Sequence, residues 1–178
     1  MARRRPPGTP AGLDAGQVVA AALDVLRRDG VEGVSMRAVA LQLRVAPNAL
    51  YGHVAGKDAL LDAVTGRLVD GVPTDDDAGW RFQLHCLAHH VWNALRPYPA
   101  LAARFLTSPA ASDAAQGVRA HADAALAGAR VPAERRDPLV TALVTLAAGL
   151  ACAGERADQA ALDAGLAGLL DSVARSAH

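Results

Sequence analysis

Aromatic side chains are scarce in this sequence, at 3% of 178 residues, although 52% of the residues are hydrophobic. The apolar residues are therefore mostly alanine, leucine and valine. Alanine and leucine favour helices, and the sequence has no stretch rich in Val, Ile or Tyr that alternates with polar residues as a half-buried strand would. The composition predicts an all-α protein.

Cysteines and long apolar runs are also few. Cys86 and Cys152 are too few for a disulfide framework, so a reduced, cytoplasmic setting is expected. The longest apolar stretch, residues 140–153, is interrupted by two threonines and a glycine and falls short of the roughly 18 residues of a membrane span. The N-terminal MARRRPPGTPAG is basic, but no apolar segment follows it, so a secretory signal is not expected.

The chain has no net charge, because 18 Lys and Arg balance 18 Asp and Glu. The charges are unevenly distributed, however. Residues 1–58 contain eight basic and five acidic residues, whereas residues 59–178 contain ten and thirteen. This asymmetry is expected when only the N-terminal part meets phosphate. Residues 1–12 are predicted to form a disordered basic arm, whose three arginines either add minor-groove contacts or have little effect.

The segment Ser35 to Lys57, SMRAVALQLRVAPNALYGHVAGK, has the pattern of two short helices joined by a tight turn. Ser35 can cap the first helix, the turn follows at Arg44, and Pro47 suits the first turn of the second helix, predicted over 47–52. This is the layout of a helix-turn-helix, which inserts one helix into the DNA major groove.

Other helices flank this segment. One is predicted from Asp14 to about Asp29, with Gly30 as its C-terminal stop. A connector helix and five more are predicted at about 57–69, 78–95, 98–107, 112–129, 133–153 and 158–176. The expected architecture is all-α with about nine helices: a three-helix helix-turn-helix domain at 13–57, the connector, and a C-terminal helical ligand-binding and dimerisation domain at 70–178.

Residues 13–69 resemble the N-terminal domain of the tetracycline-repressor (TetR) family. The resemblance covers about a third of the chain and rests on Leu13-Asp14, the run Gly30 to Ser35, Arg37, Leu50-Tyr51, His53-Val54, Lys57, Leu60 and Leu61. It implies a transcriptional repressor that is a dimer of two-domain chains. A small molecule in the C-terminal domain would then alter the distance between the two DNA-binding heads.

Base contacts are expected from the two short helices. Arg37, whose place in the family pattern brings it near a base edge, has the geometry to contact guanine. Asn48 either pairs with adenine or caps its own helix, and Pro47 and Ala49 suit a thymine methyl group.

Phosphate contacts are expected from side chains just beyond them. Tyr51 and His53 are placed to reach phosphate oxygens, which fixes the register on DNA. The alternative for Tyr51 is half-buried packing. Lys57 opens the next helix, where its charge and the helix N-terminus both attract phosphate.

The segment WRFQLHCLAHHVW, residues 80–92, concentrates aromatic and polar side chains. It predicts a ligand cavity, with plain packing as the alternative, lined by Trp80, His85, Cys86, His89, Trp92 and Phe105. The spacing of His85 and His89, like that of Cys86 and His90, can bind zinc. However, further ligands such as His121 or Asp123 are not indicated, so neither a metal nor a cofactor is expected.

The last two predicted helices have leucines at interface spacing. The candidate dimer residues, with an intramolecular core as the alternative, are Leu139, Leu143, Leu146, Leu150, Leu162, Leu166, Leu169 and Val173.

The sequence therefore predicts a ligand-responsive regulator, a repressor by family resemblance, which binds a palindromic double-stranded DNA operator as a homodimer and is released by a small-molecule effector. An effector-independent DNA-binding protein of the same fold is the alternative. A metal-dependent hydrolase using His85, Cys86 and His89 is a remote one, because no nucleophile–base pair or phosphate loop accompanies them. The chain is not expected to be an enzyme.

Overall fold

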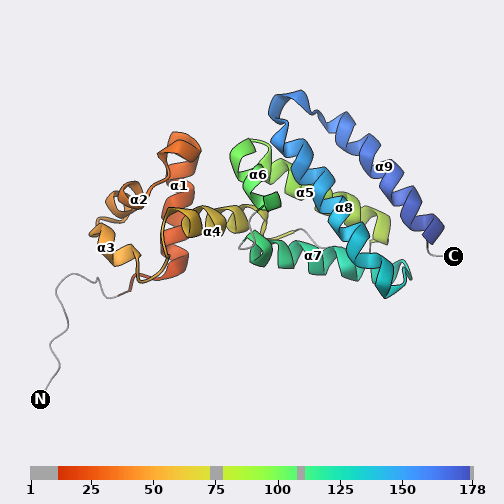
Figure 1. Cartoon of the computed structure of the whole chain (residues 1–178), viewed down its shortest axis with the longest axis horizontal. Coiled ribbons are helices and arrows are strands. Elements are labelled where there is room, and N and C mark those ends of the chain that lie inside the picture. The colour runs from red at the N-terminus through yellow and green to blue at the C-terminus, as the bar shows by residue number, and fades with distance from the viewer. Residues whose placement is uncertain (1–11, 73–77, 108–110, 177–178) are drawn as a thin grey trace, which may run out of the picture. The chain divides into compact units, whose positions relative to one another are not determined.

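The computed structural model describes residues 12–72, 78–107 and 111–176, and every regular element in these ranges is a helix. The predicted all-α fold is confirmed. The chain divides into two compact units, one up to Val64 and one from Thr65, called here the N-terminal and C-terminal units. The elements are α1 (Ala15–Gly33), α2 (Met36–Leu43), α3 (Pro47–Leu50), α4 (Lys57–Val69), α5 (Trp80–Leu95), α6 (Pro99–Thr107), α7 (Ala111–Gly128), α8 (Ala133–Cys152), the short 3₁₀ helix η1 (Gly154–Arg156) and α9 (Gln159–Ser176) (Figure 1).

Local signals set the ends of α1. Asp14 accepts a hydrogen bond from the Gln17 amide at 2.8 Å, and the Gln17 side chain accepts one from the Asp14 amide at 3.2 Å. This reciprocal pair is a capping box, which satisfies two free amides of the first turn. Gly30 leaves the helical conformation at φ 73°, as the predicted stop requires, but one more helical turn follows to Gly33.

The N-terminal unit is held by one apolar face of α1. Val18, Ala22, Val25 and Leu26 are fully buried. α1 contacts α2, and α2 contacts α3. The core is completed by buried side chains from the later elements, which are Val34, Val39, Ala40, Leu50, Leu60 and Val64. A small core thus supports helices too short to be stable alone.

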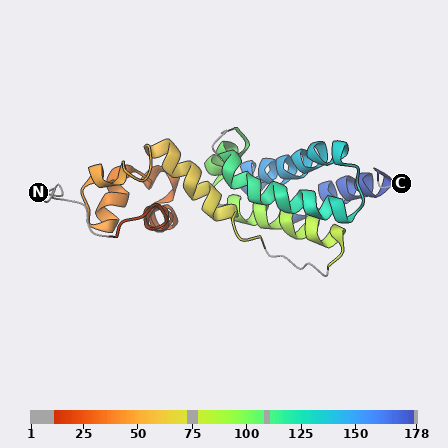
Figure 2. The same cartoon turned by 90° about the horizontal axis from the view of Figure 1, so that it is seen from below.

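The C-terminal unit is built around α8, which contacts α5, α6, α7 and α9 (Figure 2). Its core is made of leucine, valine and alanine with a few aromatic side chains. Gly165 of α9 lies against Leu146 of α8, and a Cβ atom at Gly165 would come within 2.9 Å of Leu146 Cδ1. Small residues therefore let the last two helices approach closely.

The predicted helix bounds from 57 onwards are confirmed to within two residues, whereas η1 was not predicted. The predicted arm at residues 1–12 lies, except for Gly12, outside the described residues. Within the described ranges, no helix is both long and apolar enough to cross a membrane.

Candidate nucleic-acid interface

The turn between α2 and α3 is fixed by backbone hydrogen bonds. Ser35 caps α2 by accepting a hydrogen bond from the Ala38 amide at 3.1 Å. At the other end Arg44 adopts a left-handed conformation, with φ 57°, and the Val45 amide donates to the Ala40 carbonyl at 3.0 Å. Bonds of this kind satisfy the last carbonyls of a helix and redirect the chain.

α3 is a single turn that depends on Leu50. Pro47 occupies its first turn, where the missing N–H costs nothing. The Leu50 side chain is fully buried, and its carbonyl accepts hydrogen bonds from the His53 and Val54 amides at 2.9 and 3.0 Å. The helix predicted over 47–52 is therefore shorter than expected, because residues after Leu50 form a hydrogen-bonded turn.

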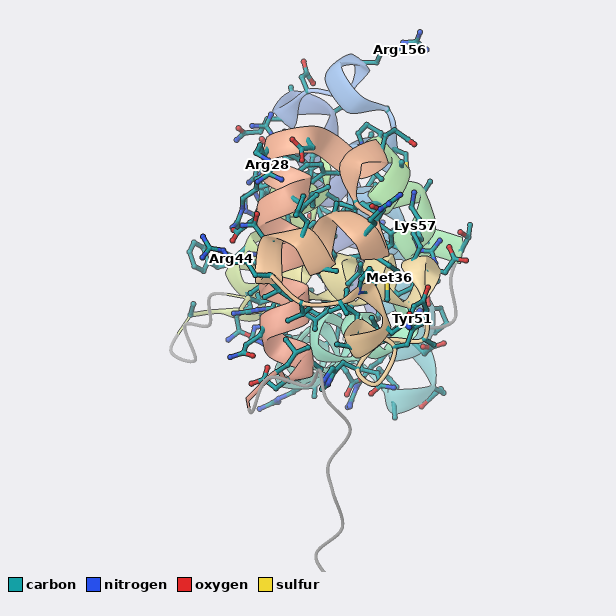
Figure 3. All side chains as sticks on the ribbon, turned by 90° about the vertical axis from the view of Figure 1, so that its left-hand side faces the viewer. Arg28, Met36, Arg44, Tyr51, Lys57 and Arg156 are labelled. Carbon is teal, nitrogen blue, oxygen red and sulfur yellow. The ribbon has the colours of Figure 1, made fainter. Side chains whose placement is uncertain are left out.

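The predicted DNA-binding side chains face solvent around this anchored turn. Tyr51 is 55% exposed, which favours contact with a partner over the packing alternative. Ala49 and His53 are half-buried. The other predicted contact residues, all exposed, are Arg37, Pro47, Asn48 and Lys57. Figure 3 shows Tyr51 and Lys57 toward one edge of the N-terminal unit.

The basic side chains of this unit differ in their partners. Arg27 forms an ion pair with Asp24 at 3.6 Å, and Arg28 forms one with Asp29 at 2.9 Å. Arg28 also donates a hydrogen bond to the side chain of Gln42 in α2. Its hydrogen bond to Asp29 lowers the pKa of that carboxyl below its usual value.

By contrast, Arg37, Arg44 and Lys57 have no acidic partner among the residues that the structure describes. They are thus available to phosphate or base atoms. Arg44 was not predicted as a contact residue, and its exposed place at the helix-turn-helix turn was the available signal. Figure 3 shows it at the opposite edge of the unit from Tyr51.

The six residues predicted to line a ligand cavity lie in different surroundings. Trp92 is buried and lines an open groove of about 730 Å³, whose other walls are Asn93, Arg96, Pro97, Pro99, Gly154, Ala157, Asp158 and Gln159. Phe105 is part of the core, and Trp80 and Cys86 are half-buried.

The two histidines of that set face α9. His89 Nε2 lies 2.7 Å from Asp163 Oδ1, and His85 Nε2 lies 3.4 Å from the same oxygen. Cys86 is not part of this cluster, so the grouping of His85, Cys86 and His89 in the remote hydrolase alternative is not supported. The third member of the observed cluster is the acidic residue Asp163. It lies 74 residues from His89 in the sequence, so no local spacing identified it.

The predicted dimer residues divide by burial. Leu139, Leu146, Leu150 and Leu169 are partly exposed. Leu143, Leu162, Leu166 and Val173 are at most 3% exposed within one chain. The prediction is corrected for these four: they belong to the intramolecular core, which was the alternative.

Comparison with known proteins identifies the N-terminal unit. The family model of the bacterial regulatory proteins, tetR family, matches residues 18–64. The HTH-type transcriptional repressor DrrR1 of Streptomyces coeruleorubidus is 34% identical over 123 residues, which are 65% of this chain and 46% of that protein. An HTH-type transcriptional regulator of Saccharopolyspora erythraea is 33% identical over 115 residues, which are 64% of this chain and 49% of that protein. The chain thus spans about half the length of these relatives.

Solved structures resemble the chain over nearly its whole length. The crystal structure of BioQ with its natural double-stranded DNA operator has a TM-score of 0.76 and 28% identity, covering 92% of this chain and 99% of that one. A TetR variant of Acinetobacter baumannii in complex with minocycline has a TM-score of 0.77 at 24% identity, covering 93% and 96%, which supports the fold alone. Residues 18–64 therefore match the helix-turn-helix domain of the tetR family of bacterial regulatory proteins, and the solved structures resemble the rest of the chain in fold.

Proposed function

We propose that this protein is a transcriptional repressor that binds a palindromic operator as a homodimer and is released by a small-molecule effector. The observation that carries the proposal is the exposed set of side chains around the buried Leu50 anchor, in which Arg37, Tyr51 and Lys57 face solvent. Polar and basic side chains without partners in the described part of the chain suit DNA, an anionic ligand that also presents base edges. The likeness to BioQ, crystallised with its operator, supports the same conclusion.

The contacts divide by chemistry. Arg37, Asn48 and the apolar surfaces of Pro47 and Ala49 would meet base edges, while the phosphate contacts would come from Tyr51, His53, Lys57 and Arg44. In proteins of this kind phosphate contacts set register and base contacts set sequence preference. Few polar side chains are available to contact bases. We therefore expect phosphate contacts to contribute more to DNA affinity than base contacts contribute to sequence preference.

Selection of bound sites from random double-stranded DNA, using the purified full chain, tests the proposal. We expect an inverted repeat whose half-sites are centred about 34–36 Å apart, one turn of B-DNA. Tyr51→Ala should weaken binding to the selected site, measured by fluorescence anisotropy, whereas Arg27→Ala should not. Recovery of no enriched sequence, with binding equal for all DNA, would contradict an operator-binding repressor.

The homodimer would form through the outer faces of α8 and α9. On α9 the exposed face carries small side chains, which are Ala160, Ala161, Ala164, Ala167 and Gly168, and α8 adds Ala142, Gly149 and the partly exposed Leu146 and Leu150. Small residues permit close helix approach, and a two-fold axis would bring the same face of each chain together.

Ala167→Glu tests this interface, with Ala127→Glu on α7 as the matched control. Both alanines are exposed in one chain, so both variants should fold. We expect analytical ultracentrifugation to show a dimer for the control and a monomer for Ala167→Glu, because two glutamates would be placed in an apolar interface. A dimer in both variants would move the interface elsewhere.

The effector would bind in the groove beside Trp92. The Trp92 Nε1 atom is buried and has no hydrogen-bond partner in the described part of the chain, and Arg96 lies 4.8 Å from the ring centroid. A buried N–H without a partner is costly, so a ligand that opens the groove and brings an acceptor to this atom would be stabilised. Trp92→Phe keeps the ring bulk and removes this donor.

A melting-temperature screen across a compound library tests the groove. Compounds that stabilise the wild-type chain should release it from the operator and should lose effect in Trp92→Phe but not in Trp80→Phe. If both variants respond like wild type, the effector binds elsewhere.

One observation favours the effector-independent alternative. The cavity enclosed between α5, α7, α8 and α9 measures only about 10 Å³, which is about the room of one water molecule. A library that yields no stabilising compound would support this alternative. In either case we propose that the protein acts in the cytoplasm and without catalysis.

A further inference from the structure

His85, His89 and Asp163 converge on one point between α5 and α9. The two histidines are four residues apart on α5, so their side chains share one face of that helix. Their Nε2 atoms lie 3.4 and 2.7 Å from Asp163 Oδ1, and the three ligand atoms are all within 4.8 Å of one another.

A second contact fixes the register of the two helices. Arg81 of α5 donates to Asp171 of α9 at 3.0 Å. From Arg81 to His89 and from Asp171 back to Asp163 are eight residues each, so the two helices run antiparallel here. Leu84, Leu87, Leu166 and Leu170 are buried beneath this polar row. The three side chains are therefore held on packed helices rather than on a loop.

A histidine–carboxylate hydrogen bond accounts for only part of this arrangement. The 2.7 Å contact of His89 is such a bond, but His85 also points its Nε2 atom at the same oxygen. The two imidazole rings are stacked, with centroids 4.3 Å apart. One carboxylate oxygen with two imidazole nitrogens around it is a set of three ligand atoms for a metal ion.

The dimensions fit a tetrahedral zinc ion. Zn–N and Zn–O bonds of about 2.0–2.2 Å place neighbouring ligand atoms about 3.3–3.5 Å apart. The His85 contact already has this length, and the His89 contact would open by roughly 0.6 Å. The side chains of His85 and Asp163 are each 44% exposed, so an ion can enter from solvent.

We propose that His85, His89 and Asp163 bind one Zn²⁺ ion, with water in the fourth position. Two imidazoles and one carboxylate favour zinc and similar transition metals, whereas Mg²⁺ and Ca²⁺ favour sets made only of oxygen. The proposal goes beyond DNA binding, because the site would exist whatever operator the N-terminal unit recognises.

Nearby candidates have other partners. His90 Nε2 contacts the Val69 carbonyl at 3.2 Å, on another side of α5. Asp123 lies 3.6 Å from Arg136, which neutralises it. Asp163 thus takes the place for which the sequence had offered His121 or Asp123.

Isothermal titration of the full chain with ZnSO₄, after chelator treatment and without an affinity tag, tests the site. We expect one equivalent of Zn²⁺ per chain, with no competition from millimolar Mg²⁺. His89→Gln and Asp163→Asn each remove a ligand and should weaken binding by more than the roughly 10–100-fold that loss of an outer-shell partner costs. His90→Gln and His121→Gln change histidines outside the cluster, so they are matched controls and should bind like wild type.

Cobalt gives a second measurement that does not depend on heats of binding. Co²⁺ bound by the three side chains and one water should show the intense visible absorption of tetrahedral cobalt, in wild type and both controls only. Circular dichroism confirms that each variant is folded. No Zn²⁺ uptake by the wild type, or equal uptake by His89→Gln and Asp163→Asn, would overturn the proposal.

Discussion

The two units of this chain use their side chains in opposite ways. In the N-terminal unit the candidate DNA-binding residues span 21 positions, from Arg37 to Lys57, and all of them are exposed or half-buried. In the C-terminal unit the notable polar cluster joins His85 and His89 to Asp163, more than 70 positions away. The DNA-binding residues thus come from one short segment, whereas the polar cluster forms only because α5 packs against α9.

This difference decides what each unit can tolerate. Exposed side chains around α3 can change without disturbing a core, because Leu50 and α1 carry the packing. The contacts between α5 and α9 lie directly above buried leucines, so a shift of either helix would alter both packing and polar groups.

The largest expected effects test whether the units are independent. Leu50→Ala and Leu166→Ala each empty a fully buried position, one in each unit, and should each lower stability by about 2–5 kcal/mol. Scanning calorimetry should show Leu50→Ala lowering the melting of the N-terminal unit and Leu166→Ala that of the C-terminal unit.

Leu41→Ala is the matched control, because Leu41 lies in the same unit as Leu50 and is 80% exposed. It should leave melting nearly unchanged. One transition that both core variants lower equally would contradict two separately stable units.

The next effect concerns base contacts. Arg37→Ala should remove about 1–3 kcal/mol of discrimination at one base pair of the selected operator, because a bidentate arginine–guanine contact would be lost. Affinities for operator and single-base variants, measured at one salt concentration, check this. Arg27→Ala, which removes an arginine already paired with Asp24, should change nothing. Equal loss on every sequence would reassign Arg37 to phosphate.

A smaller and uniform effect is expected for Lys57→Ala. It should weaken all DNA sequences alike and reduce the slope of log affinity against log salt by about one, because one phosphate contact is lost. Titrations at several salt concentrations measure the slope. A slope equal to that of wild type would exclude a phosphate contact by Lys57.

The smallest effect is expected for Asp29→Asn. The hydrogen bond from Arg28 lowers the Asp29 pKa, so its folded-state pKa lies below its unfolded value. The ion pair therefore stabilises the fold above the unfolded pKa, and this contribution is lost as pH falls through the folded pKa. The pair is exposed, so urea denaturation should show a slight loss at pH 7 that disappears in acid.

Local patterns predicted most of the fold. Caps and breakers such as Asp14, Ser35 and Pro47 act within a few residues, so helix bounds could be read from the chain. The site residues of the helix-turn-helix lie in one such segment. The extent of α3 was overestimated, because hydrogen bonds to the Leu50 carbonyl replace helix with turn.

Long-range packing was not predictable in the same way. The leucine spacing of α9 identified a buried stripe but not which partner covers it, and Leu162, Leu166 and Val173 proved to face their own core. Asp163 could not be assigned to His85 and His89, because the pairing depends on how α9 lies against α5.

The double acceptor role of the Leu50 carbonyl has an evolutionary consequence. The backbone path from Pro47 to Val54 is held by a buried side chain and by two main-chain bonds, none of which uses the side chains of residues 48, 49 or 51. Substitutions at Asn48 and Ala49, the two that would meet base edges, would therefore alter which DNA is bound while keeping the scaffold. A lineage of such proteins could acquire new target genes through a few codon changes.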